Sequence, residues 1–129
     1  MATSTPGGAK TNMGLEPNIA GLLCYVPCCI GFVFSVVAAI VEKQSRFVRF
    51  HAFQSLLVHA AAIVLGIGLQ VLQVVLGVAG LGAVGLLLSL VGMVVGVAFL
   101  GLTIFLMIKA NAGEELELPV VGSLARQWA

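Results

Sequence analysis

Four residues of types that bind metals or carry redox chemistry lie in the apolar part of this sequence: Cys24, Cys28, Cys29 and His59. Cys24 and Cys28 are one helical turn apart, which would place both thiols on the same face of a helix. A structural zinc site needs about four ligands, and His59 is the obvious further candidate. His59 and Cys28 would lie several ångströms apart in depth if each occupied its own membrane-crossing helix. We therefore predict that the cysteines pack as small residues, and that the chain holds no metal and no cofactor.

Three polar side chains interrupt the next apolar stretch: His59, Gln70 and Gln73. An ionisable group inside a membrane span is a candidate functional site by default. Together these residues could line a polar path for transport. The alternative is that they form hydrogen bonds between helices, which is a common role of polar side chains in membranes. The second interpretation is favoured, because three helices leave little room for a pore.

A polar segment begins at Glu42 and continues to Ser55. Two arginines in it alternate with two phenylalanines, which is typical of an anchor at the membrane surface. The same segment could instead bind a partner protein. His51 and Ser55 are one turn apart, which suits a hydrogen-bond network that fixes the loop. The candidate functional or interaction residues are therefore Arg46, Arg49, His51, Gln54, Ser55 and His59.

No catalytic motif is present in the sequence. The chain has no Gly-x-Ser-x-Gly, no P-loop and no aspartate at all, and no pair of carboxylates lies in an apolar stretch. The one acidic cluster, Glu114, Glu115 and Glu117, follows the last apolar stretch and is expected to be solvated. We predict that the protein is not an enzyme, binds no nucleic acid and has no small-molecule substrate that the sequence identifies.

The distribution of charge predicts the elements that position these residues. Of the 129 residues, 60% are apolar and 9% are charged, whereas a soluble domain has about 25% charged residues. Residues 17–41 and 50–108 contain no Asp, Glu, Lys or Arg. Because a span needs about 20 residues, the first stretch holds one span and the second holds two. We predict an all-α integral membrane bundle with three transmembrane helices, at about residues 19–41, 52–76 and 86–108.

The segments outside these helices predict an orientation. Residues 1–18 are expected to form a flexible polar tail, and residues 109–129 a cytoplasmic tail. Lysines and arginines gather between the first two helices and after the third, so the positive-inside rule places both regions in the cytoplasm. The N-terminus would then lie outside a bacterial inner membrane. The expected partners are the lipid bilayer and either other membrane proteins or further copies of this chain.

Small and polar residues recur every three or four positions on one face of each predicted helix. Membrane helices associate by close packing of such residues, so the three faces are predicted to meet inside a left-handed bundle. Gly92 and Gly96 match the small-xxx-small pattern, and packing within the chain is favoured over packing between copies. The predicted packing residues are Cys24, Cys28, Gly31, Ser35, Gly66, Ser89, Gly92 and Gly96.

One stretch resembles a known motif. Arg49-Phe50-His51-Ala52-Phe53-Gln54-Ser55 resembles the RFHA-x-QS signature of small bacterial membrane proteins. Leu23-Cys24-Tyr25-Val26-Pro27 is similar to the start of that family's first span, and Leu118-Pro119-Val120-Val121-Gly122-Ser123-Leu124-Ala125 to its ending. That family is grouped with the twenty-kilodalton component of the chloroplast inner-envelope protein translocon. The resemblance implies a multi-pass membrane protein, and likeness of fold alone does not assign a role.

The resulting first hypothesis is a non-enzymatic membrane protein that acts as a subunit or accessory factor of a larger membrane complex. One alternative is a transport or protein-translocation component that works as a homo-oligomer. The other is a membrane redox protein that binds a cofactor through Cys24, Cys28 and His59.

Overall fold

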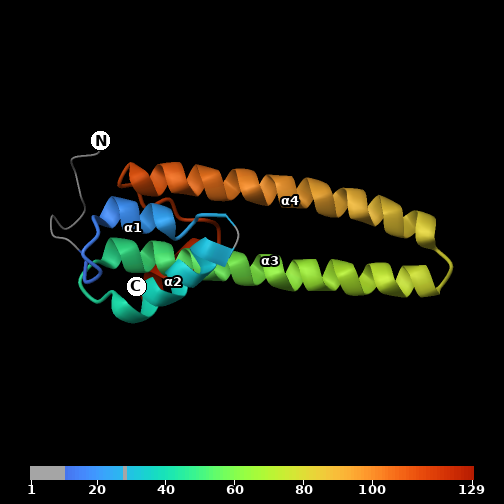
Figure 1. Ribbon diagram of the computed structural model, residues 1–129, viewed down its shortest axis with the longest axis horizontal. Helices are drawn as coiled ribbons and strands as arrows, with labels where there is room; N and C mark the ends of the chain where they lie inside the picture. The colour runs from blue at the N-terminus through green and yellow to red at the C-terminus, as the bar shows by residue number, and fades with distance from the viewer. Residues whose placement is uncertain (1–10, 28) are drawn as a thin grey trace.

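The computed structural model describes residues 11–27 and 29–129. Within them the chain forms five α-helices and no strand. In Figure 1, α3 and α4 make a long antiparallel hairpin, and α1 and α2 lie along one half of it. The shorter α5 packs on α3. The bounds are α1 Pro17–Leu23, α2 Cys29–Val41, α3 Arg46–Val78, α4 Gly82–Asn111 and α5 Val121–Trp128.

Two helices of the described part are long and apolar enough to cross a membrane, α3 and α4. They have 33 and 30 residues, or about 50 and 45 Å at 1.5 Å per residue, against a hydrocarbon core of about 30 Å. The 13 residues of α2 reach only about 20 Å. The all-helical prediction is therefore confirmed, and the prediction of three transmembrane helices is wrong.

The predicted span over residues 19–41 is broken between α1 and α2. α1 ends at Leu23, four residues before Pro27, whose ring would clash with the Leu23 carbonyl in a continuous helix. The hydroxyl of Ser55 donates to the carbonyl oxygen of Cys24 at 2.5 Å, and the hydroxyl of Ser35 lies 3.0 Å from the same oxygen and 2.7 Å from the Gly31 carbonyl oxygen. The bond from Ser55 satisfies an acceptor that the end of α1 leaves without a helical partner. The helix predicted over residues 19–41 is thus interrupted at Pro27.

The segment from α1 to α2 returns to the end of the molecule where it began. The backbone N–H of Asn12 donates to the Glu42 carboxylate at 2.8 Å, and the N–H of Lys43 donates to the Asn12 side chain at 2.7 Å. Residues just before α1 and just after α2 are therefore neighbours. The prediction that these two regions lie on opposite sides of the membrane is wrong, because a segment that turns back does not cross.

This topology predicts a labelling result. Glu16 and Ser123 are both exposed and lie outside the two long helices. We expect single cysteines introduced by Glu16→Cys and Ser123→Cys to react with a membrane-impermeant maleimide from the same side of sealed vesicles. The wild-type chain, with its own three cysteines, gives the background labelling. Modification of the two positions from opposite sides would show that residues 17–41 cross the membrane.

The hairpin turn is shorter than the stretch 77–85 that separates the two predicted helices. Of the stretch 77–85, only Ala79–Leu81 is non-helical. Gly80 has φ +79°, and the N–H of Leu81 donates to the carbonyl of Leu76 at 2.8 Å, as in a Schellman motif. One glycine with a left-handed backbone is therefore sufficient to end α3, and the other glycines of this stretch lie in helices.

The packed core occupies only the end of the hairpin that α1, α2 and α5 surround. Tyr25, Phe50 and Leu106 are fully buried there. Toward the turn that joins them, α3 and α4 extend past the other helices and run side by side (Figure 1). Their large apolar side chains are exposed, for example Val64 at 71%. The charge-free half of the hairpin therefore presents apolar side chains outward over a length of about 30 Å.

Candidate functional site

The candidate site has two parts: a buried polar network at the packed end of the molecule, and an apolar groove beside it. Tyr25 and His51 form the centre of the network, with the Tyr25 hydroxyl 2.9 Å from Nδ1 of His51. The side-chain amide of Gln54 donates to the same hydroxyl at 3.0 Å. All three side chains are fully buried.

The network holds residues 114–118, called the C-terminal segment below, against α3. Nε2 of His51 is 3.1 Å from the carbonyl oxygen of Glu114. Because that oxygen can only accept, Nε2 donates and Nδ1 accepts the proton of the tyrosine hydroxyl. Gln54 also donates to the Leu116 carbonyl at 2.9 Å and accepts from the Leu118 N–H at 3.0 Å. Every polar group in this chain of bonds has a partner, which makes it a rigid connection rather than a reactive centre.

Arg49, in α3, donates hydrogen bonds to the ends of two other helices, α2 and α5. Its guanidinium donates to the carbonyl of Glu42, which follows α2, at 2.9 Å, and to the carbonyl of Trp128 in α5 at 3.1 Å. The buried carboxylate of Glu42 accepts from the backbone N–H groups of Gln44 and Ser45 at the start of α3. Arg49, predicted to anchor the membrane surface, therefore satisfies backbone groups at helix ends.

Arg46 and the acidic cluster lie at the surface of the same end. Arg46 is exposed and reaches the carbonyl of Arg126 at 3.5 Å. Arg126 pairs with Glu117 at 3.2 Å and with Glu115 at 2.9 Å, and these carboxylates, Glu117 first, raise its pKa above the usual value. Lys109 pairs with Glu114 at 3.0 Å. The cluster expected to be solvated is therefore exposed but paired with cations.

The cysteines show no arrangement for metal binding in the described residues. Cys24 is fully buried and its thiol donates to the Ala20 carbonyl. Burial raises the pKa of this thiol well above its usual value, so it is held as a thiol. Cys29 is exposed, and Cys28 lies outside the described residues. Residues 11–27 and 29–129 contain no group of three potential ligands.

The predicted polar path is not assembled in the structure. His59 bonds within its own helix to Ser55. Gln73 donates to the Ser89 hydroxyl at 3.0 Å and so joins α3 to α4, whereas Gln70 is exposed. His51 and Ser55 do not bond to each other. His51 bonds to Tyr25 and to the Glu114 carbonyl, and Ser55 donates to the Cys24 carbonyl.

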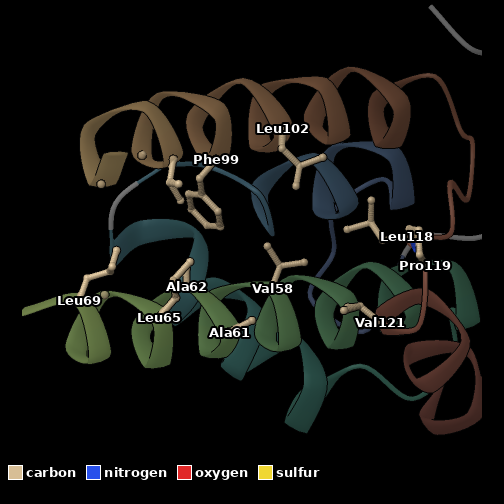
Figure 2. A pocket seen from close by; sticks show the side chains of 14 residues that line it. Val58, Ala61, Ala62, Leu65, Leu69, Phe99, Leu102, Leu118, Pro119 and Val121 are labelled. Carbon is tan, nitrogen blue, oxygen red and sulfur yellow. The ribbon is translucent and has the colours of Figure 1, made fainter. Parts of the chain in front are cut away.

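The second part of the site is a groove of about 510 Å³ between α3 and α4. Figure 2 shows its walls, with Leu118, Pro119 and Val121 closing one end. A Cβ atom added to Gly66 or Gly96 would meet no atom within 4 Å. The predicted packing face is thus divided: Cys24, Gly31 and Ser35 are buried, whereas the glycines of the long helices line an open groove. The groove residues are Val58, Ala61, Ala62, Leu65, Gly66, Leu69, Gly92, Val95, Gly96, Phe99, Leu102, Leu118, Pro119 and Val121.

Sequence reasoning missed Tyr25 and Glu42 as members of the site. Tyr25 is the only tyrosine in the chain, and a hydroxyl near Pro27 in an apolar stretch was a signal for a buried partner. Glu42 ends the first charge-free stretch, which suggested a surface position. Its complete burial follows from the backbone N–H groups that surround its carboxylate.

Comparison with known proteins places this arrangement in a family. Residues 12–125 match the model of the magnetosome magnetite crystal formation protein family. A UPF0132 membrane protein of Methanocaldococcus jannaschii is 38% identical over 93% of this chain and 94% of its own length. A UPF0132 membrane protein of Archaeoglobus fulgidus is 34% identical over 88% of this chain and 95% of its own length. No solved structure matches the chain at a comparable level.

These matches correct the resemblance to the translocon-related bacterial family. The Arg49–Ser55 motif that carried the resemblance lies inside the region matched by a different family, and both relatives are archaeal membrane proteins. The translocon assignment is therefore wrong, although the membrane assignment is confirmed. The chain belongs to the magnetosome magnetite crystal formation protein family, and the two archaeal proteins that it resembles are described as membrane proteins.

Proposed function

We propose that this protein is a non-enzymatic membrane scaffold whose copies associate through the groove between α3 and α4. The observation that carries the proposal is the openness of this groove. Small residues line both of its walls, and the glycine positions face free space. In a membrane, glycines at a helix surface allow the close approach of another helix.

A second copy of this chain is the occupant that fits the groove best. An occupant must be free of charge along the whole hairpin, because residues 50–108 offer no charged group to pair with. The same hairpin in another copy meets that requirement and brings its own glycine-lined face. Two identical faces can form a closed symmetric contact, which is the commonest form of homo-oligomer. The exposed apolar hairpin also supports insertion into the membrane. Assembly into a larger complex would need a different protein as partner.

The test fills the groove and measures the oligomeric state in mild detergent by native mass spectrometry. We expect the wild-type chain to form oligomers and Gly66→Leu to reduce them strongly. Gly68→Leu is the matched control, because Gly68 is two residues away, faces open space and does not line the groove. A monomeric wild-type protein, or equal loss in both variants, would contradict the proposal.

The proposal also includes an orientation of the protein in the membrane. In the described residues, every lysine and arginine lies at the end of the molecule where α5 packs, and none lies near the turn at Ala79–Leu81. The positive-inside rule supports a cytoplasmic position for that end, including residues 11–16.

The family name refers to magnetite crystal formation, but the carboxylates of Glu114, Glu115 and Glu117 are paired with cationic side chains. That pairing favours association over mineral binding as the role of this chain.

A further inference from the structure

A second cavity of about 380 Å³ lies beside the groove and is open at the side. It is formed by one copy of the chain, with walls from α2, α3 and α4, so it does not depend on the proposed association. The imidazole of His59 and the thiol of Cys29 are the polar groups among its described walls. The lining residues are Cys29, Phe32, His59, Ala62, Ile63 and Phe99.

The hydrogen bonds of His59, which lines this cavity, determine which of its ring nitrogens is left to accept a hydrogen bond. Nδ1 is 2.8 Å from the carbonyl oxygen of Ser55, which can only accept, so Nδ1 carries the proton. The Ser55 hydroxyl is 3.2 Å from the same nitrogen, but its own proton is directed to the Cys24 carbonyl. In the neutral ring, Nε2 is then left with a lone pair and no proton.

A ligand that donates a hydrogen bond to Nε2 would be stabilised at this position. Nε2 has no hydrogen bond with any atom of residues 11–27 and 29–129. His59 lies ten residues after Arg49, about 15 Å along α3, within the stretch that has no charged residue. A polar atom facing apolar surroundings without a partner is costly, and that cost is recovered by a ligand that donates a hydrogen bond.

Two phenylalanines define the shape of the ligand. The rings of Phe32 and Phe99 stand edge-on to the His59 ring, with centroids 5.9 and 5.8 Å away. They come from α2 and α4, so they flank the imidazole from two sides. Edge-to-face contacts of this kind suit a further aromatic ring. A phospholipid head group does not suit the site, because the described walls carry no charge to balance it.

We propose that this cavity binds the head group of a lipid-soluble hydroquinone, with a ring hydroxyl donating to Nε2 of His59. The ring lies against Phe32 and Phe99, and its apolar tail leaves through the open side into the bilayer. Binding involves no covalent or electron-transfer step in this protein.

The experiment uses the full chain in detergent micelles, labelled with ¹⁵N histidine, and decyl-substituted benzohydroquinone as the probe. The chain has two histidines, and both nitrogens of His51 are already bonded to Tyr25 and Glu114. We expect saturable binding that shifts the Nε2 signal of His59 and leaves the signals of His51 in place. The dimethyl ether of the probe has no donor, and we expect it to leave all four signals unchanged.

Variants separate the hydrogen bond from simple partition into an apolar cavity. His59→Phe keeps an aromatic ring but removes the acceptor, and we expect it to weaken hydroquinone binding about tenfold. Gln70→Leu is the matched control, because it removes an exposed polar group of α3 outside the cavity, and its affinity should equal that of the wild type. Equal binding of hydroquinone and ether, full affinity in His59→Phe, or no binding to the wild type would each overturn the proposal.

Discussion

Gly31→Ala is expected to destabilise the packed end of the molecule more than any other single methyl addition in the long or short helices. The added Cβ would contact the carbonyl oxygen of Val26, and would lie 2.8 Å from the Val26 nitrogen and 3.0 Å from the Cys24 oxygen. These are backbone atoms of the loop that separates α1 from α2, so they cannot rotate away as a side chain could. We expect the free energy of unfolding to fall by about 3 kcal/mol.

Gly68→Ala provides the control for this result. Gly68 lies in the exposed half of α3, and a Cβ there meets no atom within 4 Å. Alanine is also the better helix former, so stability should stay the same or rise slightly. Unfolding in detergent, followed by circular dichroism as SDS is added, measures both variants. A small effect of Gly31→Ala would mean that the loop does not cross so closely over the start of α2.

The long helices could be predicted from the sequence because charge is absent from residues 50–108. This feature depends on composition alone, and lipid imposes it wherever a helix is exposed. The break between α1 and α2 is different. Pro27 occurs in an apolar stretch long enough to span, and proline in such a stretch often causes only a kink. At the break the Ser55 hydroxyl donates to the Cys24 carbonyl, and no local pattern reveals this bond from α3.

The same limit applies to the functional residues. His51 and Gln54 were predictable as candidates because they are polar residues at the start of an apolar helix. Their partners were not, since Tyr25 precedes them by more than 25 residues and the C-terminal segment follows about 60 residues later. Helical periodicity likewise placed Gly66 on one face of a helix. Periodicity identifies a shared face, but it does not determine whether another helix covers that face.

Gln54→Leu is expected to release the C-terminal segment from α3. Leucine keeps a similar size but removes the donor to Tyr25, the donor to Leu116 and the acceptor for Leu118. The groups left behind are buried or partly buried, so the unfolding free energy should fall by about 3 kcal/mol. Deuterium exchange of the Leu118 amide should accelerate strongly, because Gln54 Oε1 accepts the hydrogen bond of that amide.

The position of Gly122 explains why this release should extend into α5. A Cβ atom at Gly122 would lie 2.7 Å from Cα of Glu117 and 2.9 Å from Oε1 of Gln54, so the first turn of α5 packs directly on the bond that the variant removes. We therefore expect faster exchange across residues 114–128 together, and no change in the parts of α3 and α4 next to the turn that joins them. Gln70→Leu makes the same change at an exposed position of α3 and should leave exchange at the wild-type rate. If the Leu118 amide stayed protected in Gln54→Leu, packing of α5 on α3 would be sufficient to hold residues 114–118. The hydrogen bonds of Gln54 would then not be what holds this segment on α3.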